Sequence, residues 1–188
     1  MLRVLIFVMS IVVNSAAFCD NPKVIMTTNL GEVEIELNAE AAPITVENFL
    51  RYVESGFYTD TIFHRVIPGF MVQGGGYSQT FTEKNPYAPI ANEADNGLEN
   101  KIGSIAMART NRPHSATAQF FINVANNTFL NHKSKSLRGW GYAVFGEVIG
   151  GMDVVNAIAT APTGSGGPFV KDVPTKSIII QSINVIGN

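Results

Sequence analysis

Residues 23–37 read KVIMTTNLGEVEIEL and hold two apolar segments on either side of Asn29-Leu30. In the second segment Val33, Ile35 and Leu37 alternate with three glutamates. Alternation with a period of two predicts a strand that buries one face and exposes the other. This stretch predicts a protein built mainly of β-strands.

Two later segments have the periodicity of helices. Between Pro43 and Gly56, apolar residues recur at i, i+3, i+4 and i+7 from Val46, which predicts an amphipathic helix. A weaker pattern at 152–158 predicts a second helix, and the β-branched stretch 177–186 predicts a closing strand. Many short strands with two helices favour a barrel or a sandwich, and closing the sheet into a barrel would remove exposed edges.

Composition sets limits on the class of protein. The chain has 188 residues, which fits one domain with its own core, and 46% apolar with 15% charged residues excludes a disordered chain. A formal net charge of −2 gives no reason to expect nucleic acid as a partner. The single cysteine, Cys19, excludes an intrachain disulfide, and the spacing of His64, His114 and His132 matches no metal site. No metal is expected.

Positions 1–19 differ from the rest of the chain. Arg3 precedes the apolar run 4–13, and the small residues 15–17 follow it. This order predicts a secretory signal peptide. The run is much shorter than the roughly 20 residues of a spanning helix, so a permanent membrane anchor is the weaker alternative.

Two cleavage positions fit this segment, one after Ala17 and one after Cys19. A lipoprotein signal fits less well, because the bulky Phe18 stands immediately before the cysteine. The predicted mature domain, 20–188, would then have no membrane segment.

Two glycine-rich runs, 74–76 and 164–167, superficially look like phosphate-binding loops. Neither is followed by Lys-Ser/Thr or by dinucleotide-binding spacing. We therefore expect both runs to be turns.

The motifs that carry chemistry lie between these elements. Residues 63–76, FHRVIPGFMVQGGG, resemble the cyclophilin signature, and 103–109, GSIAMAR, with 115–123, SATAQFFIN, resemble the other half of the cyclophilin site. Shorter matches extend the resemblance from about Val24 to the C-terminus. The amino-acid sequence of several stretches, notably 92–98, is most similar to that of the periplasmic cyclophilins of Gram-negative bacteria.

The resemblance implies a mainly β fold, a closed eight-stranded antiparallel barrel capped by two α-helices, with a substrate groove on its outer face. It implies a peptidyl-prolyl cis-trans isomerase that rotates the peptide bond before proline and needs no cofactor. The expected partners are proline-containing peptides and folding exported proteins. The expected location is the periplasm, and the expected state is a monomer.

The resemblance also assigns roles to single residues. Arg65 matches the catalytic arginine, and Gln73 matches the glutamine that holds the substrate carbonyl and orients the arginine. Gln119 lies beside the same groove, and backbone groups at Ala108 and Arg109 match the edge that pairs with the residue before proline, so their side chains should matter less. The pocket for the proline ring is matched by Phe70, Met71, Phe121, Phe129 and Leu130.

Two positions depart from the best-known eukaryotic pattern. Phe129 stands where that pattern has tryptophan, and Tyr142 stands where it has histidine. The missing indole N–H predicts weak binding of the inhibitor cyclosporin. Trp140 lies close in sequence, within the stretch 133–140, which is longer than in similar bacterial cyclophilins. Whether its indole N–H replaces the donor that is missing at Phe129 stays open.

A second class of function fits the same barrel, namely a chaperone or adaptor that binds proline segments without catalysis. Such a binder needs the apolar pocket, but it gains nothing from a donor directed at a transition state. The joint presence of Arg65 and Gln73 therefore favours the enzyme.

Overall fold

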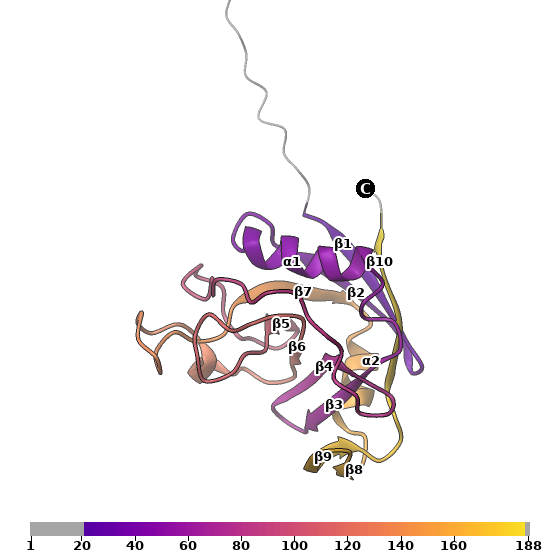
Figure 1. Ribbon diagram of the computed structural model, residues 1–188. Coiled ribbons are helices and arrows are strands. Elements are labelled where there is room, and N and C mark those ends of the chain that lie inside the picture. Colours follow the sequence, from indigo (N-terminus) through magenta and orange to yellow (C-terminus); the bar gives the residue numbers. More distant parts are fainter. Residues whose placement is uncertain (1–20, 187–188) are drawn as a thin grey trace, which may run out of the picture.

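The computed structural model describes residues 21–186, so the predicted signal peptide lies outside the described residues. The fold is a closed antiparallel barrel (Figure 1). Its eight strands, in their order around the barrel, are β1 (Lys23–Thr28), β10 (Ile179–Ile186), β3 (Thr61–Ile67), β4 (Met71–Ser78), β6 (Phe120–Asn123), β5 (Ser104–Met107), β7 (Val144–Gly150) and β2 (Gly31–Leu37). The barrel expected from the resemblance is confirmed.

The N-terminal strands follow the period of two in the sequence. β1 pairs with β2 so that Met26 lies opposite Val33. Val33, Ile35 and Leu37 have no exposed surface, whereas the glutamates between them lie outside the core. Burial of alternate side chains therefore fixes which face of the sheet points inward.

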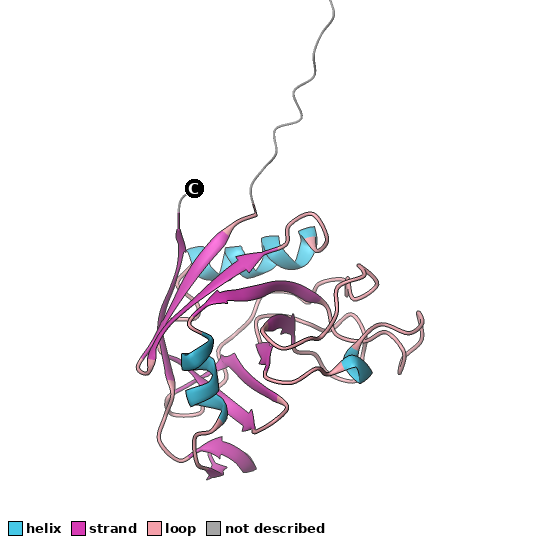
Figure 2. Cartoon of the chain, turned by 180° about the vertical axis from the view of Figure 1, so that it is seen from behind, coloured by secondary structure: helices cyan, strands magenta, loops and turns pink. Residues whose placement is uncertain are grey.

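Two helices pack against the barrel and lie apart from each other (Figure 2). α1 spans Pro43–Glu54 and begins with a proline in its first turn, where the missing N–H does no harm. The ring of its Phe49 lies 5.8 Å from that of Phe120 and 5.2 Å from that of Phe145 inside the core. α2 spans Met152–Ala159. Among residues 21–186, no helix is long and apolar enough to cross a membrane.

A two-stranded sheet lies outside the barrel strands. It consists of β8 (Thr163–Gly166) and β9 (Phe169–Pro174), and it packs against β3. The expectation of a turn at 164–167 is therefore wrong for its first three residues, because they lie in β8, which pairs with β9. A short 3-10 helix, η1 (Thr128–Leu130), completes the regular elements of the described chain.

The expectation of a turn at 74–76 is also wrong, because these glycines lie inside β4. A Cβ atom at Gly75 would lie 2.8 Å from the ring of Phe120, and one at Gly76 would lie 2.5 Å from Cγ of Gln119. Gly75 also has a φ of +81°, which favours glycine. The run gives room for close packing and does not reverse the chain.

β4 and β6 bury residues on both faces. Val72 and Phe120 point into the main core, while the next residue along each strand, Gln73 or Phe121, points outward. The outward face carries a second, small apolar cluster outside the barrel. Its buried members are Met71, Ala106, Phe121 and Val144.

Candidate active site

Strand register places Arg65 and Gln73 side by side on the outer face of the barrel. Arg65 on β3 lies directly opposite Gln73 on β4, and Gln73 lies opposite Phe121 on β6. Nη1 of Arg65 donates to Oε1 of Gln73 at 3.3 Å, and Nε2 of Gln73 donates to Oε1 of Gln119 at 3.1 Å. The two amides thus form a chain that orients the guanidinium.

A hollow of about 110 Å³ lies next to this chain. It brings together nine of the residues assigned from the sequence, namely Arg65, Phe70, Met71, Gln73, Ala108, Arg109, Phe121, Leu130 and Tyr142. Gln119 stands behind this wall through its hydrogen bond to Gln73. Phe129 is 62% exposed and stacks on Phe70 at 5.7 Å, so the structure places it at the rim and not in the wall.

Glycine at position 76 makes room for this arrangement. The side chain of Gln119 lies over Gly76, where any Cβ would collide with it. The backbone beneath Gln119 is also fixed, since its carbonyl accepts a hydrogen bond from the N–H of Ala108 at 2.9 Å. The sequence signal for this role is the glycine run itself, although the run alone predicts a turn.

The wall of the hollow is positively charged. It contains Arg65 and Arg109 and no carboxylate. None of the three ion pairs found in residues 21–186 involves either arginine. A guanidinium stays protonated in proteins, so both charges persist in a protein whose formal net charge is −2.

The Arg109 side chain is part of this wall. Its Nε donates to the carbonyl of Gly141 at 2.9 Å and its Nη1 donates to the carbonyl of Thr110 at 2.9 Å. Its guanidinium carbon lies 4.6 Å from the centre of the Tyr142 ring, and that ring meets Phe121 edge-on at 5.7 Å. The side chain of Arg109 therefore lines the hollow in addition to its backbone.

A buried network of asparagines supports the apolar side of the hollow, and sequence reasoning missed it. Nδ2 of Asn127 donates to the carbonyl of Phe70 at 2.9 Å and to Oδ1 of Asn123 at 2.7 Å. Nδ2 of Asn123 donates in turn to Oδ1 of Asn100 at 3.2 Å. The network ties the turn that carries Phe70 to the start of η1, which carries Leu130. Its signal was a concentration of asparagines after β6.

His64 precedes Arg65 but points to the other side of the strand. It is 2% exposed and lies between the rings of Tyr77, at 4.8 Å, and Phe169, at 5.4 Å. Its Nδ1 has no hydrogen-bond partner among the described residues. The pKa of His64 is lowered from 6.5 to about 4, mainly because burial disfavours the charged form; a backbone hydrogen bond at Ile62 partly opposes this shift, and the nearby charge of Arg65 adds to it.

Trp140 does not supply the donor that Phe129 lacks. Its Nε1 donates to the carbonyl of Asn92 at 3.1 Å. Its ring packs against His114 at 4.7 Å and His132 at 5.6 Å. The indole therefore anchors the stretch 133–140.

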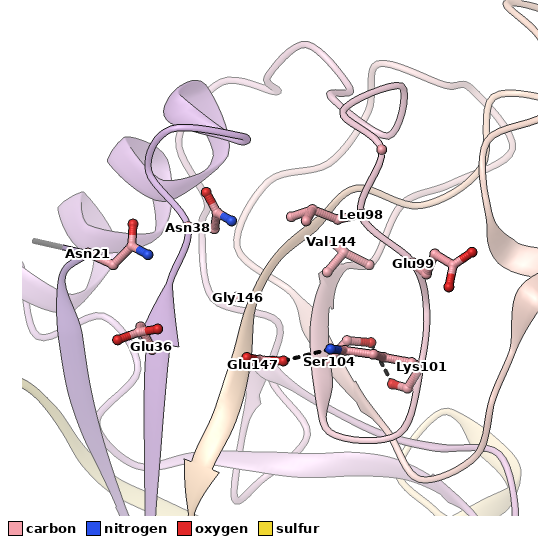
Figure 3. A pocket seen from close by; sticks show the side chains of 11 residues that line it. Asn21, Glu36, Asn38, Leu98, Glu99, Lys101, Ser104, Val144, Gly146 and Glu147 are labelled. Carbon is pink, nitrogen blue, oxygen red and sulfur yellow. Dashed lines mark hydrogen bonds and ion pairs between the residues drawn. The ribbon is translucent and has the colours of Figure 1, made fainter.

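A larger hollow of about 370 Å³ opens between β2, β5 and β7 (Figure 3). Glu36, Glu99 and Glu147 line it together with Lys101, which pairs with Glu147 at 3.0 Å. It contains none of the residues assigned from the sequence. Within the described chain no cluster of three potential metal ligands occurs, here or elsewhere. The smaller, arginine-lined hollow is therefore the candidate active site.

Comparisons with known proteins identify relatives of the chain. Residues 23–185 match the family model described as cyclophilin type peptidyl-prolyl cis-trans isomerase/CLD. The chain is 57% identical over 162 residues to peptidyl-prolyl cis-trans isomerase cyp18 of Streptomyces antibioticus, which covers 86% of this chain and 97% of the relative. It is 50% identical over 187 residues to peptidyl-prolyl cis-trans isomerase A of Dickeya dadantii, with 98% and 96% covered.

A solved structure has the same fold. It is the crystal structure of a Cryptosporidium parvum cyclophilin type peptidyl-prolyl cis-trans isomerase, determined in the presence of the dipeptide Ala-Pro. It superposes with a TM-score of 0.70 at 29% sequence identity, covering 88% of this chain and 99% of that one.

Proposed function

Because this chain belongs to the cyclophilin-type peptidyl-prolyl cis-trans isomerase family, we propose that Arg65 accelerates the isomerisation and that the hollow beside it binds the proline ring. The protein is a peptidyl-prolyl cis-trans isomerase, and proline-containing peptides are its substrates. The observation that carries the proposal is the arginine-lined hollow itself, with a donor and an apolar wall next to each other.

The chemistry to be catalysed is rotation about an amide bond. Resonance in the planar amide sets a barrier of about 18–20 kcal/mol, although X–Pro bonds populate both isomers. In the twisted state the prolyl nitrogen loses conjugation, and its lone pair can accept a hydrogen bond. A donor at that point stabilises the transition state more than either ground state, which is the requirement for catalysis.

Arg65 has the properties of that donor. It carries a permanent charge and five N–H groups, of which one is used toward Gln73. Gln73 and Gln119 act as positioning residues, because their hydrogen bonds limit the directions in which the guanidinium can point. Preorganised donors act efficiently because they need no rearrangement during the reaction.

The apolar part of the hollow would hold the proline ring while the rest of the peptide turns. The wall is supplied by Met71 and Phe121, which belong to the outer apolar cluster, and by Phe70 and Leu130, which pack against it. Burial of the ring at about 25 cal/mol per Å² favours binding without favouring one isomer. Binding and acceleration are thus assigned to different side chains.

Substitution of Arg65 tests the division of roles. Arg65→Ala removes a charge-assisted hydrogen bond worth about 1.5–3 kcal/mol, so turnover should fall roughly ten- to hundredfold while peptide affinity changes little. Arg65→Lys should rescue little, since an ammonium lacks the planar fork. Exchange NMR on a prolyl peptide measures isomerisation and binding in one sample. Isomer exchange at the wild-type rate with Arg65→Ala would contradict the mechanism and favour a non-catalytic binder.

We also propose that the enzyme assists the folding of exported proteins in the periplasm. The support is the sequence of 1–19, with a basic residue, a short apolar run and small residues in the order of a secretory signal. X–Pro isomerisation takes tens to hundreds of seconds when uncatalysed, so it can limit folding after export.

A further inference from the structure

We propose that Arg109 selects substrates that carry an acidic residue immediately before the proline, by pairing with its carboxylate. This inference rests on the proposed function, because it uses the backbone at Ala108 and Arg109 as the edge along which the peptide lies. It adds a substrate class to that function and a role to a side chain that sequence reasoning left without one.

The first argument is charge. The hollow is lined by two arginines and by no acidic residue, and neither arginine forms an ion pair within residues 21–186. One permanent charge suffices for the proposed donation to the prolyl nitrogen, and Arg65 supplies it. The charge of Arg109 is thus without a carboxylate partner in the described chain, on a wall that the peptide must approach.

The second argument is the remaining hydrogen-bonding capacity of Arg109. A guanidinium has five N–H groups, and hydrogen bonds to the carbonyls of Gly141 and Thr110 use two of them. Three N–H groups are left, including both on Nη2. This is the arrangement that a carboxylate binds in a bidentate manner, which is more specific than attraction to a point charge.

The third argument is rigidity. The two backbone hydrogen bonds and the contact with the Tyr142 ring at 4.6 Å hold the guanidinium plane in place. Tyr142 is itself supported by Phe121 at 5.7 Å. An arginine that is already oriented loses little side-chain freedom when it binds an anion. The partner that fits is therefore Glu or Asp beside the proline.

The test compares two blocked peptides that differ only in charge, Ala-Glu-Pro-Phe and Ala-Gln-Pro-Phe. A half-exposed ion pair predicts that wild type has a kcat/KM about three- to fivefold higher for the glutamate peptide at about 0.01 M ionic strength. The preference should disappear in Arg109→Gln and at about 1 M salt, where screening acts within roughly 3 Å. Arg109→Lys keeps the charge and should retain part of the preference.

Arg112→Gln is the matched control, because Arg112 is an exposed arginine nearby that does not line the hollow. It should keep the wild-type ratio, and Arg65→Ala should lower both rates while leaving the ratio in favour of glutamate. Equal rates for the two peptides with wild type, or an unchanged ratio in Arg109→Gln, overturn the inference and leave the proposed function standing. If wild type accelerates neither peptide, the proposed function fails as well.

Discussion

The buried imidazole of His64 should make the stability of the fold depend on pH. Its pKa is about 4 in the folded protein and about 6.5 in an unfolded chain, since burial between Tyr77 and Phe169 disfavours the charged form. The folded state therefore binds fewer protons between these two values. The contribution of the buried, neutral imidazole to the unfolding free energy is fully present above pH 6.5 and is lost as the pH falls toward 4.

The size of this loss follows from the two pKa values. At about 1.4 kcal/mol per pH unit, the gap between 6.5 and about 4 corresponds to roughly 3 kcal/mol of unfolding free energy. Urea unfolding from neutral pH down to about 4 should show this loss in wild type. His64→Phe should lack it, because phenylalanine fits an aromatic cluster and binds no proton.

The difference between wild type and His64→Phe isolates this group, since both proteins share every carboxylate. Direct titration of the imidazole by NMR gives a second measurement that does not depend on a variant. Parallel pH profiles for the two proteins, together with an NMR pKa near 6.5, would refute the reasoning that desolvation controls this site.

Three further outcomes are expected. Gly76→Ala should displace the Gln119 side chain and lower turnover roughly two- to tenfold with the fold intact, as isomerase kinetics and circular dichroism would show; an unchanged rate would mean that Gln119 does not position the site. Phe129→Trp should strengthen cyclosporin binding by up to about tenfold in calorimetry, and unaltered affinity in a folded variant would remove the indole argument. N-terminal sequencing of the cellular protein should give a start after Ala17 or Cys19, whereas an intact N-terminus in the membrane fraction would exclude a cleaved signal.

The sequence predicted the elements that rely on a simple period. The strand at 31–37 and the helix after Pro43 agree with the structure because each buries one face against a core on one side only. β4 was harder to interpret, because its glycines leave space for rings and for Gln119 that come from other strands. The order of residues within one segment carries no information about packing partners from other strands.

The active site, like the fold, could be predicted only in part from the sequence. Residues within the two matched motifs were assigned from the resemblance, and the structure places seven of them around one hollow, together with Leu130 and Tyr142. The buried network around Asn123 and Asn127 could not be predicted, since asparagine usually lies at the surface, and the partners Asn100 and Phe70 lie 23 and 57 residues away in sequence. The orientation of Arg109 depends on a carbonyl 32 residues away, which no spacing rule anticipates.

The pairing of β1 with β10 joins the beginning and the end of the domain, with Lys23 opposite Ile186. Because β10 also pairs with β3, the barrel cannot close until the last strand has left the ribosome. Contacts between such distant residues form late and slowly. A growing chain that lacks β10 therefore stays open at two strand edges, those of β1 and β3, so folding can finish only after synthesis has ended.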